Sequence, residues 1–543
     1  MRRSCCSLIL ALCATLPVIV GANPVVEAPA GKLRGVSADD IHIFKGIPYA
    51  LPPVATNRWK PALPMPLWSG VRDATAFGAA CVQPTPRAES IYADEPPATS
   101  EDCLFLNIWA PKRAGKAPVF VWIHGGALVS GASNLSMYEG SKLARRGVVV
   151  VSINYRLGIL GYLAHPELSA ESSEKVSGNY GLKDQIEALR WVQRNIAAFG
   201  GDPTNVTIAG ESAGALSVMH LMTSPPARGL FAKAIMQSAY MITLPELRRA
   251  KHGMPSAEDI GSQLAATIGA SDLSALRSMD AAALVAKAAS AGYFPLPNLD
   301  GRTLLRQTVD VFERGEQAKV PIIAGFNEGE IRSLRMLIPP VPADAATYEA
   351  AIRARYADLA DTFLKVYPST DLEQSILAIT RDALYGWTSE KLVRSQTELG
   401  ERGYLYLFDH GYPAADNARL HAFHAAEIPY VFGNIDRTAV AWPEIPETRV
   451  ERAFSDAMSE YWTSFAKLGE PRARDQLDWP AYGTSGAYMH FAEKPTPRTR
   501  LMPGMFELND EVVCRRRAHG EQAWNWNVGI VAPALPPRGG CAR

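Results

Sequence analysis

The sequence predicts an α/β fold in which a mostly parallel sheet is flanked by helices, and three observations lead to it. The 543 residues are 47% hydrophobic and 20% charged, which are ordinary values for a globular chain. Short runs rich in β-branched residues alternate with segments of helical periodicity. Strand–helix–strand alternation requires right-handed crossovers, and these place successive strands parallel in one sheet.

Four segments have the length and composition of buried strands: residues 119–123, 148–153, 205–209 and 404–408. A helix is predicted between the second and third strands, from Lys183 to Phe199, because apolar residues recur there at helical spacing. The segment from Gly200 to Pro203 is expected to end this helix.

The charges balance, with 55 Lys and Arg against 55 Asp and Glu. A chain that binds nucleic acid electrostatically carries a basic excess or a basic stripe, so we expect no nucleic-acid partner. The composition also excludes disordered, collagen-like and coiled-coil chains. Length alone suggests about three domains. However, no linker is evident before residue 500, so we expect a single domain over residues 23–532.

The N-terminus has the pattern of a secretory signal peptide over residues 1–22. Two arginines precede an apolar run from Cys5 to Val20, and small residues up to Ala22 provide a cleavage site. An uncleaved membrane anchor is the alternative, but the run is short for a bilayer span. We therefore expect a secreted or periplasmic protein without stable membrane insertion.

Four cysteines remain after that leader: Cys81, Cys103, Cys514 and Cys541. Four cysteines allow three pairings, of which the local one, Cys81–Cys103 with Cys514–Cys541, is the simplest. Free buried thiols are the alternative. This alternative carries more weight for the second pair, because residues 533–543 have the composition of a loose C-terminal tail.

The strongest functional signal is the segment GESAG, from Gly210 to Gly214. It follows a predicted strand and precedes a predicted helix, Ala215–Thr223, which is the context of a nucleophile elbow. Ser212 would sit on a strained turn that lifts its hydroxyl above the sheet. The flanking glycines let strand and helix pass closely, and the helix N-terminus aims N–H groups at a developing anion. The alternative is a structural glycine-rich turn.

A serine nucleophile needs a base and an oxyanion hole. The segment HGGAL, residues 124–128, directly follows the strand 119–123. Small residues there let backbone amides approach a carbonyl oxygen, so the segment is a candidate oxyanion loop. The alternative is a plain Gly-Gly turn.

At this point the sequence resembles the type-B carboxylesterases, a family that also contains cholinesterases and some fungal lipases. The resemblance covers almost all of the chain after the leader and implies an α/β-hydrolase fold with a large twisted central sheet and serine esterase activity. It is carried, in order, by FKGIPYA (44–50), RW (58–59), EDCLFLN (101–107), HGGAL, NYRLG (154–158), GNYGLKDQ (178–185) and GESAG.

The resemblance implies the acid and the base of a triad. The family's acid lies in a segment like G-x-N-x-x-E, which matches Glu330 here and makes Glu328 the competing position. Ile331 departs from the small residue that the family usually has next. The family's base lies in a segment like H-x-x-[ED]-[IL]-P-[YF]-V-F, which matches His424. His421 is interpreted as a solvated loop histidine.

The order nucleophile, acid, base is that of the α/β hydrolases. By resemblance, the oxyanion donors are the N–H groups of Gly126, Ala127 and Ala213. Relatives often carry a glycine and an aromatic residue where this chain has Ala127 and Leu128. A backbone donor survives that change, whereas the loss of the aromatic side chain is expected to reshape the acyl pocket.

Three residues are expected to support this site. Gly125 belongs to the oxyanion loop. Ser238 is expected, by resemblance, to hydrogen-bond the acid, with an ordinary strand-end serine as the alternative. Glu211, beside the nucleophile, is expected to be buried and hydrogen-bonded near the site.

No cofactor and no metal is expected, because the sequence contains no Cys/His cluster with zinc spacing and no phosphate loop. The predicted partner is a small-molecule ester. Cholinesterases use a Trp in the first disulfide loop for cation–π binding. That loop has 21 residues here, with Tyr92 as its only aromatic residue and several acids and prolines. We therefore expect soluble esters rather than choline esters or lipid aggregates.

Other activities remain open. An amidase or a transacylase could use the same triad, and a non-catalytic adhesion module would have lost the serine. An esterase for anionic, polycarboxylate acyl groups, such as a natural-product or toxin ester, is a further alternative. Arg332 and Arg335, which follow the acid, could bind such groups, although an exposed helix face explains them as well.

Overall fold

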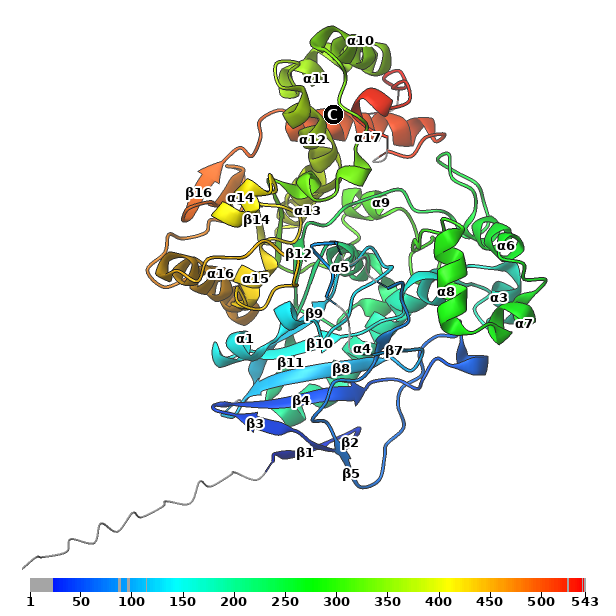
Figure 1. Ribbon diagram of the computed structural model, residues 1–543, viewed down its shortest axis with the longest axis vertical. Coiled ribbons are helices and arrows are strands. Elements are labelled where there is room, and N and C mark those ends of the chain that lie inside the picture. Colours follow the sequence, from blue (N-terminus) through cyan, green and yellow to red (C-terminus); the bar gives the residue numbers. More distant parts are fainter. Residues whose placement is uncertain are drawn as a thin grey trace, which may run out of the picture.

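An eleven-stranded sheet runs through the molecule (Figure 1). The computed structural model describes residues 23–85, 89–94, 98–113, 115–524, 527–539 and 541. The predicted signal peptide, residues 1–22, lies outside them. The strand order is β16-β15-β14-β13-β12-β11-β9-β10-β8-β4-β3.

The middle of this sheet is parallel and its margins are antiparallel. All neighbours from β10 through β9, β11, β12, β13 and β14 to β15 pair in parallel. The remaining strands, β8, β4 and β3 at one edge and β16 at the other, pair antiparallel. The prediction of a mostly parallel sheet is therefore confirmed. The strands are β3 (Val36–Ala38), β4 (Ile41–Pro48), β8 (Phe105–Pro111), β9 (Ala117–Ile123), β10 (Val149–Ile153), β11 (Gly201–Glu211), β12 (Lys233–Gln237), β13 (Ile322–Asn327), β14 (Gly403–Phe408), β15 (Ala487–Phe491) and β16 (Pro495–Thr499).

The central strands are buried on both faces, which is why they are apolar without a polar alternation. Along β9, Val119, Val121 and Ile123 point into a core shared with α4 (Tyr180–Asn195), α5 (Ala213–Thr223) and α13 (Trp387–Glu398). The intervening Phe120 and Trp122 point into a second core with α15 (Ile428–Phe432) and α16 (Arg449–Leu468). The two-residue period of a strand thus divides the apolar side chains between two helical layers.

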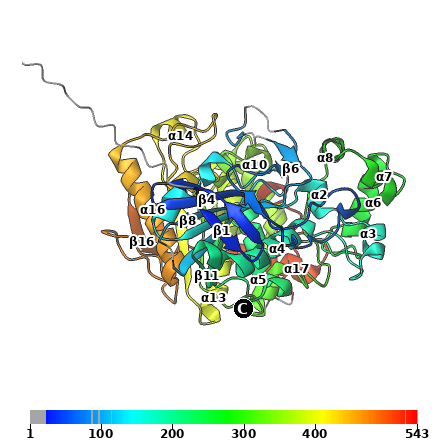
Figure 2. The same cartoon turned by 90° about the horizontal axis from the view of Figure 1, so that it is seen from below.

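Eight of the other helices form two groups away from the central strands. In Figures 1 and 2, α16 and β16 lie at one side of the molecule, and a group of short helices lies at the opposite side. That group comprises α3 (Pro166–Glu171), α6 (Ala257–Thr267), α7 (Leu273–Ser278) and α8 (Ala281–Ser290). The second group, at the top of Figure 1, comprises α10 (Ala345–Tyr356), α11 (Ala360–Val366), α12 (Leu372–Arg381) and α17 (Met505–His519).

The predicted helix between the second and third strands begins three residues early. It starts at Tyr180, and its last turn, Ile196–Phe199, is 3-10 in form. Gly200, at φ 80°, ends it in the left-handed region that favours glycine. Asp202 and Pro203 already belong to β11, whose pairing with β9 is irregular between Gly201 and Val206.

Both disulfides of the local pairing, Cys81–Cys103 and Cys514–Cys541, are formed. The second ties the end of the chain to α17. The described residues of the predicted tail contain no helix or strand, but the N–H of Leu535 donates to the carbonyl oxygen of Arg355. Within the described ranges, no helix is long and apolar enough to cross a membrane.

Candidate active site

Ser212 occupies a sharp turn between β11 and α5. Its backbone has φ 55° and ψ −121°, a conformation that costs free energy for a residue with a Cβ atom. A Cβ at position 210 would lie 2.5 Å from the carbonyl carbon of Gly214, and one at Gly214 would overlap the carbonyl oxygen of Ile123. The two glycines are therefore required for β11, α5 and β9 to approach this closely.

The side chain of Ser212 is partly exposed, whereas the two residues predicted as its partners are buried. Glu330 is 0% and His424 is 6% exposed. Glu330 begins a short 3-10 turn just after β13, and His424 lies in the loop before α15. Water therefore has little access to the carboxylate and the imidazole.

Glu330 pairs with His424 and is fixed by two further hydrogen bonds. One carboxylate oxygen contacts His424 Nδ1. The other accepts hydrogen bonds from Ser238 Oγ at 2.6 Å and from the N–H of Asn327 at 2.9 Å. In the neutral ring, a proton on Nδ1, assigned from this network, leaves Nε2 without one, as a general base requires.

Glu328, the competing position for the acid, faces elsewhere. Its carboxylate pairs with Arg381 at 3.0 Å and with Arg332 at 3.5 Å. The two glutamates, only two residues apart, thus point to different surroundings, and Glu330 is the one that reaches His424.

Glu211 approaches the other side of the imidazole. Its Oε1 lies 3.2 Å from His424 Nε2, and its Oε2 would lie 2.9 Å from a Cβ placed on Gly125. Within the described ranges, no hydrogen bond joins Ser212 Oγ to His424. The ring nitrogen that would serve the serine faces the Glu211 carboxylate instead.

The charges of these buried groups are coupled. Burial by itself lowers the pKa of His424, but the carboxylates of Glu211 and Glu330 outweigh it and raise the pKa to about 9. Burial raises the pKa of Glu211 to about 8, against the attraction of the His424 cation. Glu211 can raise the pKa of His424 only while it is itself ionised, so these values belong to the pair.

The candidate oxyanion loop turns back on itself beside Ser212. Gly126, Ala127 and Leu128 all have positive φ, at 104°, 56° and 60°. A Cβ on Gly125 would lie 3.2 Å from Ser212 Cβ, so the loop passes directly along the serine. Gly126 is exposed and Ala127 partly exposed.

The N–H groups of this region are available as donors. The backbone hydrogen bonds of the described chain give the N–H groups of Gly126 and Ala127 no acceptor. Ala213 is the first residue of α5, where an N–H has no partner within the helix. The Leu128 side chain is buried, at 2% exposure, and packs into the core that β9 shares with α4, α5 and α13.

A second layer of side chains around His424 was not predicted. The Tyr92 hydroxyl donates to the carbonyl oxygen of His424 at 2.9 Å and is hydrogen-bonded to Ser333 Oγ at 2.8 Å. Asn327 Nδ2 donates to Glu427 Oε2 at 2.6 Å, and Gln237 Nε2 donates to Glu427 Oε1 at 2.8 Å. Only Glu427 had a signal in the sequence, because it lies three residues after the histidine in the motif that identifies His424.

One tyrosine lies against the imidazole and is backed by a second. The Tyr385 ring lies 5.4 Å from the His424 ring, and Tyr240 meets Tyr385 edge-on at 6.0 Å. Tyr385 belongs to a π-helical turn, Asp382–Gly386, between α12 and α13. Such turns occur frequently at functional sites, but nothing in the sequence marks this one.

His421 lies outside the Glu330–His424 group, and it is paired rather than freely solvated. Its ring contacts Asp409 at 3.0 Å and Asp416 at 2.8 Å. Among the described residues, Glu328, Asp409 and His421 bring their ligand atoms within 4.8 Å of one another, close enough to hold a cation. Each of the three already has an ion-pair partner in the structure, so the group needs no metal to balance its charges.

Comparisons with known proteins identify the family of the chain. The family model described as "Carboxylesterase family" matches residues 22–507. Fumonisin B1 esterase of Sphingopyxis macrogoltabida is 37% identical, over 87% of this chain and 86% of its own length. Para-nitrobenzyl esterase of Bacillus subtilis is 38% identical, over 85% and 93%.

The fold is shared with solved structures as well. A PNB esterase structure matches 90% of this chain and 99% of its own, with a TM-score of 0.78 at 33% identity. Family, fold and relatives coincide over almost the whole described chain. The chain belongs to the carboxylesterase family and is a hydrolase of carboxylic esters.

Proposed function

We propose that the chain hydrolyses esters through an acyl-enzyme, with Ser212 as nucleophile, His424 as general base and Glu330 as the residue that orients the base. The observation that carries the proposal is the Glu330–His424 pair, anchored by Ser238 and the backbone of Asn327, beside a serine on a strained turn.

In the first half-reaction, His424 takes the proton of Ser212 as Oγ attacks the ester carbonyl. The N–H groups of Gly126, Ala127 and Ala213 stabilise the oxyanion. His424 then protonates the leaving alcohol, and the acyl group remains on Ser212.

In the second half-reaction, water attacks the acyl-enzyme while His424 accepts its proton. His424 then returns this proton to Ser212 Oγ as the carboxylic acid is released. Hydrogen bonds between nucleophile and base are often long in a free enzyme and tighten once substrate is bound. In this mechanism Nε2 turns from Glu211 toward the serine when substrate is bound.

For the substrate, we propose soluble esters that do not carry choline. Tyr92, the only aromatic residue of the first disulfide loop, is held by His424 and Ser333 and meets Trp442 edge-on at 6.0 Å. Trp442 is buried, at 5% exposure. The loop itself contains no Trp, the residue whose ring face binds a quaternary ammonium best.

An anionic acyl group, which the sequence left open, is the second candidate for the substrate, and one relative is named fumonisin B1 esterase. Arg332 and Arg335, which follow the proposed acid in sequence, are poorly suited to bind an anionic acyl group, because both already contact side chains of the protein. Arg332 contacts Glu328 and Gln374, and Arg335 pairs with Glu373 at 2.9 Å. Fumonisin B1 therefore belongs in a substrate screen, but we do not assign it to these two arginines.

We also propose that residues 1–22 direct export, in agreement with the two disulfides, which form and persist in oxidising compartments. Mass spectrometry of protein recovered from the periplasm or the medium tests this. We expect an N-terminus at residue 23. A mature protein that retains residue 1 would contradict it.

The function is tested with purified wild-type protein and the Ser212→Ala variant on a panel of esters of graded acyl and alcohol size, with matching amides. We expect ester hydrolysis with a burst of alcohol release, and Ser212→Ala activity below about 10⁻³ of wild type at an unchanged melting temperature. Amides turned over faster than their esters would favour an amidase. Substantial activity of the alanine variant would point to another nucleophile.

A further inference from the structure

The loop that carries the proposed oxyanion donors is held at its far end by a side chain from the first disulfide loop. The N–H of Gly131 donates to Gln83 Oε1 at 2.8 Å, and Gln83 Nε2 donates back to the carbonyl oxygen of Gly131 at 3.0 Å. One amide thus binds both backbone polar groups of a single residue, as a neighbouring strand would. This reciprocal pair fixes the position and the orientation of that backbone.

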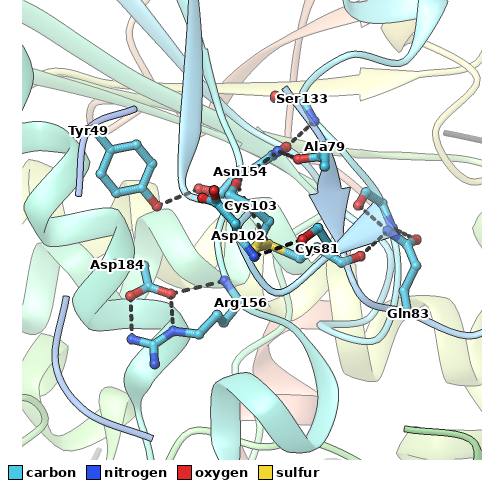
Figure 3. The surroundings of a disulfide bond; sticks show 12 residues. Tyr49, Ala79, Cys81, Gln83, Asp102, Cys103, Ser133, Asn154, Arg156 and Asp184 are labelled. Atoms are coloured by element: carbon cyan, nitrogen blue, oxygen red, sulfur yellow. Dashed lines mark hydrogen bonds and ion pairs between the residues drawn. A yellow bond between two sulfur atoms is a disulfide. The ribbon is translucent and has the colours of Figure 1, made fainter. Parts of the chain in front are cut away.

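Gln83 is itself anchored to the disulfide. Its Nε2 also donates to the carbonyl oxygen of Cys81 at 3.0 Å, and Cys81 is bonded to Cys103 (Figure 3). The carbonyl oxygen of Cys103 accepts from Asn154 Nδ2 at 3.1 Å, and Asn154 Oδ1 accepts from the N–H of Ser133 at 2.9 Å. The disulfide therefore sits between two side chains that bind the same short segment of the loop.

The loop is tight enough to transmit this constraint. The N–H groups of Val129 and Ser130 both donate to the carbonyl oxygen of Gly126, at 2.9 and 3.0 Å. Gly131, at φ 108°, lies so close to Gly125 that a Cβ on it would come within 2.5 Å of the Gly125 carbonyl oxygen. A shift of Gly131 therefore moves Gly125 and Gly126 with it, because the loop has no slack between them.

We infer that Gln83 is a positioning residue for ester hydrolysis: it holds the loop so that the N–H groups of Gly126 and Ala127 point at the oxyanion. The inference rests on the proposed function of that loop. Gln83 does not touch the reacting atoms, so its effect should appear where the oxyanion forms, in the transition state. A misplacement of about 1 Å can cost about 100-fold in rate, whereas binding of the neutral ester hardly depends on these donors.

The test replaces the amide by a side chain of the same length, Gln83→Met. The matched control is Gln193→Met. Gln193 is likewise half-buried, and its amide donates to two backbone carbonyls, those of Pro203 and Leu230, at 2.8 and 2.9 Å, far from the loop in sequence. Both variants lose a comparable number of hydrogen bonds, so their melting temperatures should fall by similar amounts.

We expect Gln83→Met to lower kcat by about 10- to 100-fold with little change in KM. The inhibition constant of an arylboronic acid, whose tetrahedral adduct with Ser212 places an oxygen in the hole, should rise by a similar factor. Gln193→Met should keep both constants within about twofold of wild type. Gln83→Asn, one methylene too short to reach Gly131, should repeat the loss of kcat, and it provides the readout if the methionine variant does not fold.

Three results would overturn the inference. Gln83 variants as active as Gln193→Met would show that the loop holds its geometry without the amide. A loss confined to KM, or a loss of kcat with an unchanged boronic acid inhibition constant, would show that Gln83 acts elsewhere. Wild-type protein without ester hydrolysis would instead overturn the proposed function, and this inference with it.

Discussion

Replacing Glu211 by Gln should move the acid limb of the pH–rate profile to lower pH. As the proposed general base, His424 would act only when it is neutral, so kcat/KM should rise with pH through the pKa of this residue. In the wild type, burial lowers that pKa, and the carboxylates, Glu211 first, raise it to about 9. Removing the negative charge of Glu211 destabilises the imidazolium, and the neutral, active form is then populated at lower pH.

The distance sets the size of the effect. Two unit charges 3.2 Å apart, at an effective dielectric constant of about 20, interact with about 5 kcal/mol, or nearly 4 pKa units. This is an upper bound, because burial raises the pKa of Glu211 to about 8 and leaves the carboxylate only partly ionised near neutral pH. We therefore expect the acid limb to shift downward by at least about one pH unit.

The assay is kcat/KM for an uncharged ester, measured from about pH 5 to about pH 10. Glu427→Gln is the matched control, since Glu427 is also buried near His424 but contributes less to its pKa and is hydrogen-bonded by Asn327 and Gln237. The acid limb of the pH–rate profile should move to lower pH by less in Glu427→Gln than in Glu211→Gln. An unchanged or upward-shifted limb for Glu211→Gln, or a larger shift for Glu427→Gln, would refute the reasoning.

The remaining predictions concern the rival histidine, the elbow and the choline question. His421→Ala should keep near-normal activity, and equal inactivity of His421→Ala and His424→Ala would contradict the assignment of the base. Asp409 raises the pKa of His421 to about 9 against the effect of burial. The ion pair of these two residues therefore stabilises the fold fully below the unfolded pKa of histidine, and this stabilisation is lost as the pH rises through about 9. His421→Ala should accordingly lower the melting temperature more at about pH 6 than at about pH 10. Gly214→Ala should destabilise the protein by at least about 2 kcal/mol in a denaturant titration, because the added Cβ has no space. Gly115→Ala should leave the stability unchanged, because nothing lies within 4 Å of its added Cβ. Equal stability of the two variants would contradict the close packing of α5 against β9 at Gly214. Butyrylcholine should show no advantage in kcat/KM over 3,3-dimethylbutyl butyrate, its uncharged counterpart, and a tenfold preference for the cation would disprove the interpretation of the aromatic residues.

The sequence by itself determined the individual strands and the turn at Ser212, because these depend on neighbouring residues only. The strands 119–123 and 404–408 were predictable because an apolar, β-branched run of that length has few other uses in a globular chain. The turn at Ser212 was predictable because two glycines around one serine, between a strand and a helix, describe a backbone conformation that other residues resist. The positions of Glu330 and His424 came from longer motifs shared with a family, and not from spacing, since neither residue differs in kind from Glu328 or His421.

The contacts between distant segments were decided by the tertiary structure. Glu330 and His424 are separated by 94 residues, and Gln83 and Gly131 by 48. Whether such pairs meet depends on strand order, on register and on the exact exit of each loop. The approach of Glu211 to the imidazole, the contact of Tyr385 with His424 and the amide that holds the proposed oxyanion loop were therefore not predicted. The sequence determines which chemistry the chain can carry, and the order β9, β11, β12, β13 in the sheet determines which side chains share it, because a shift of one residue in register turns every side chain to the opposite face.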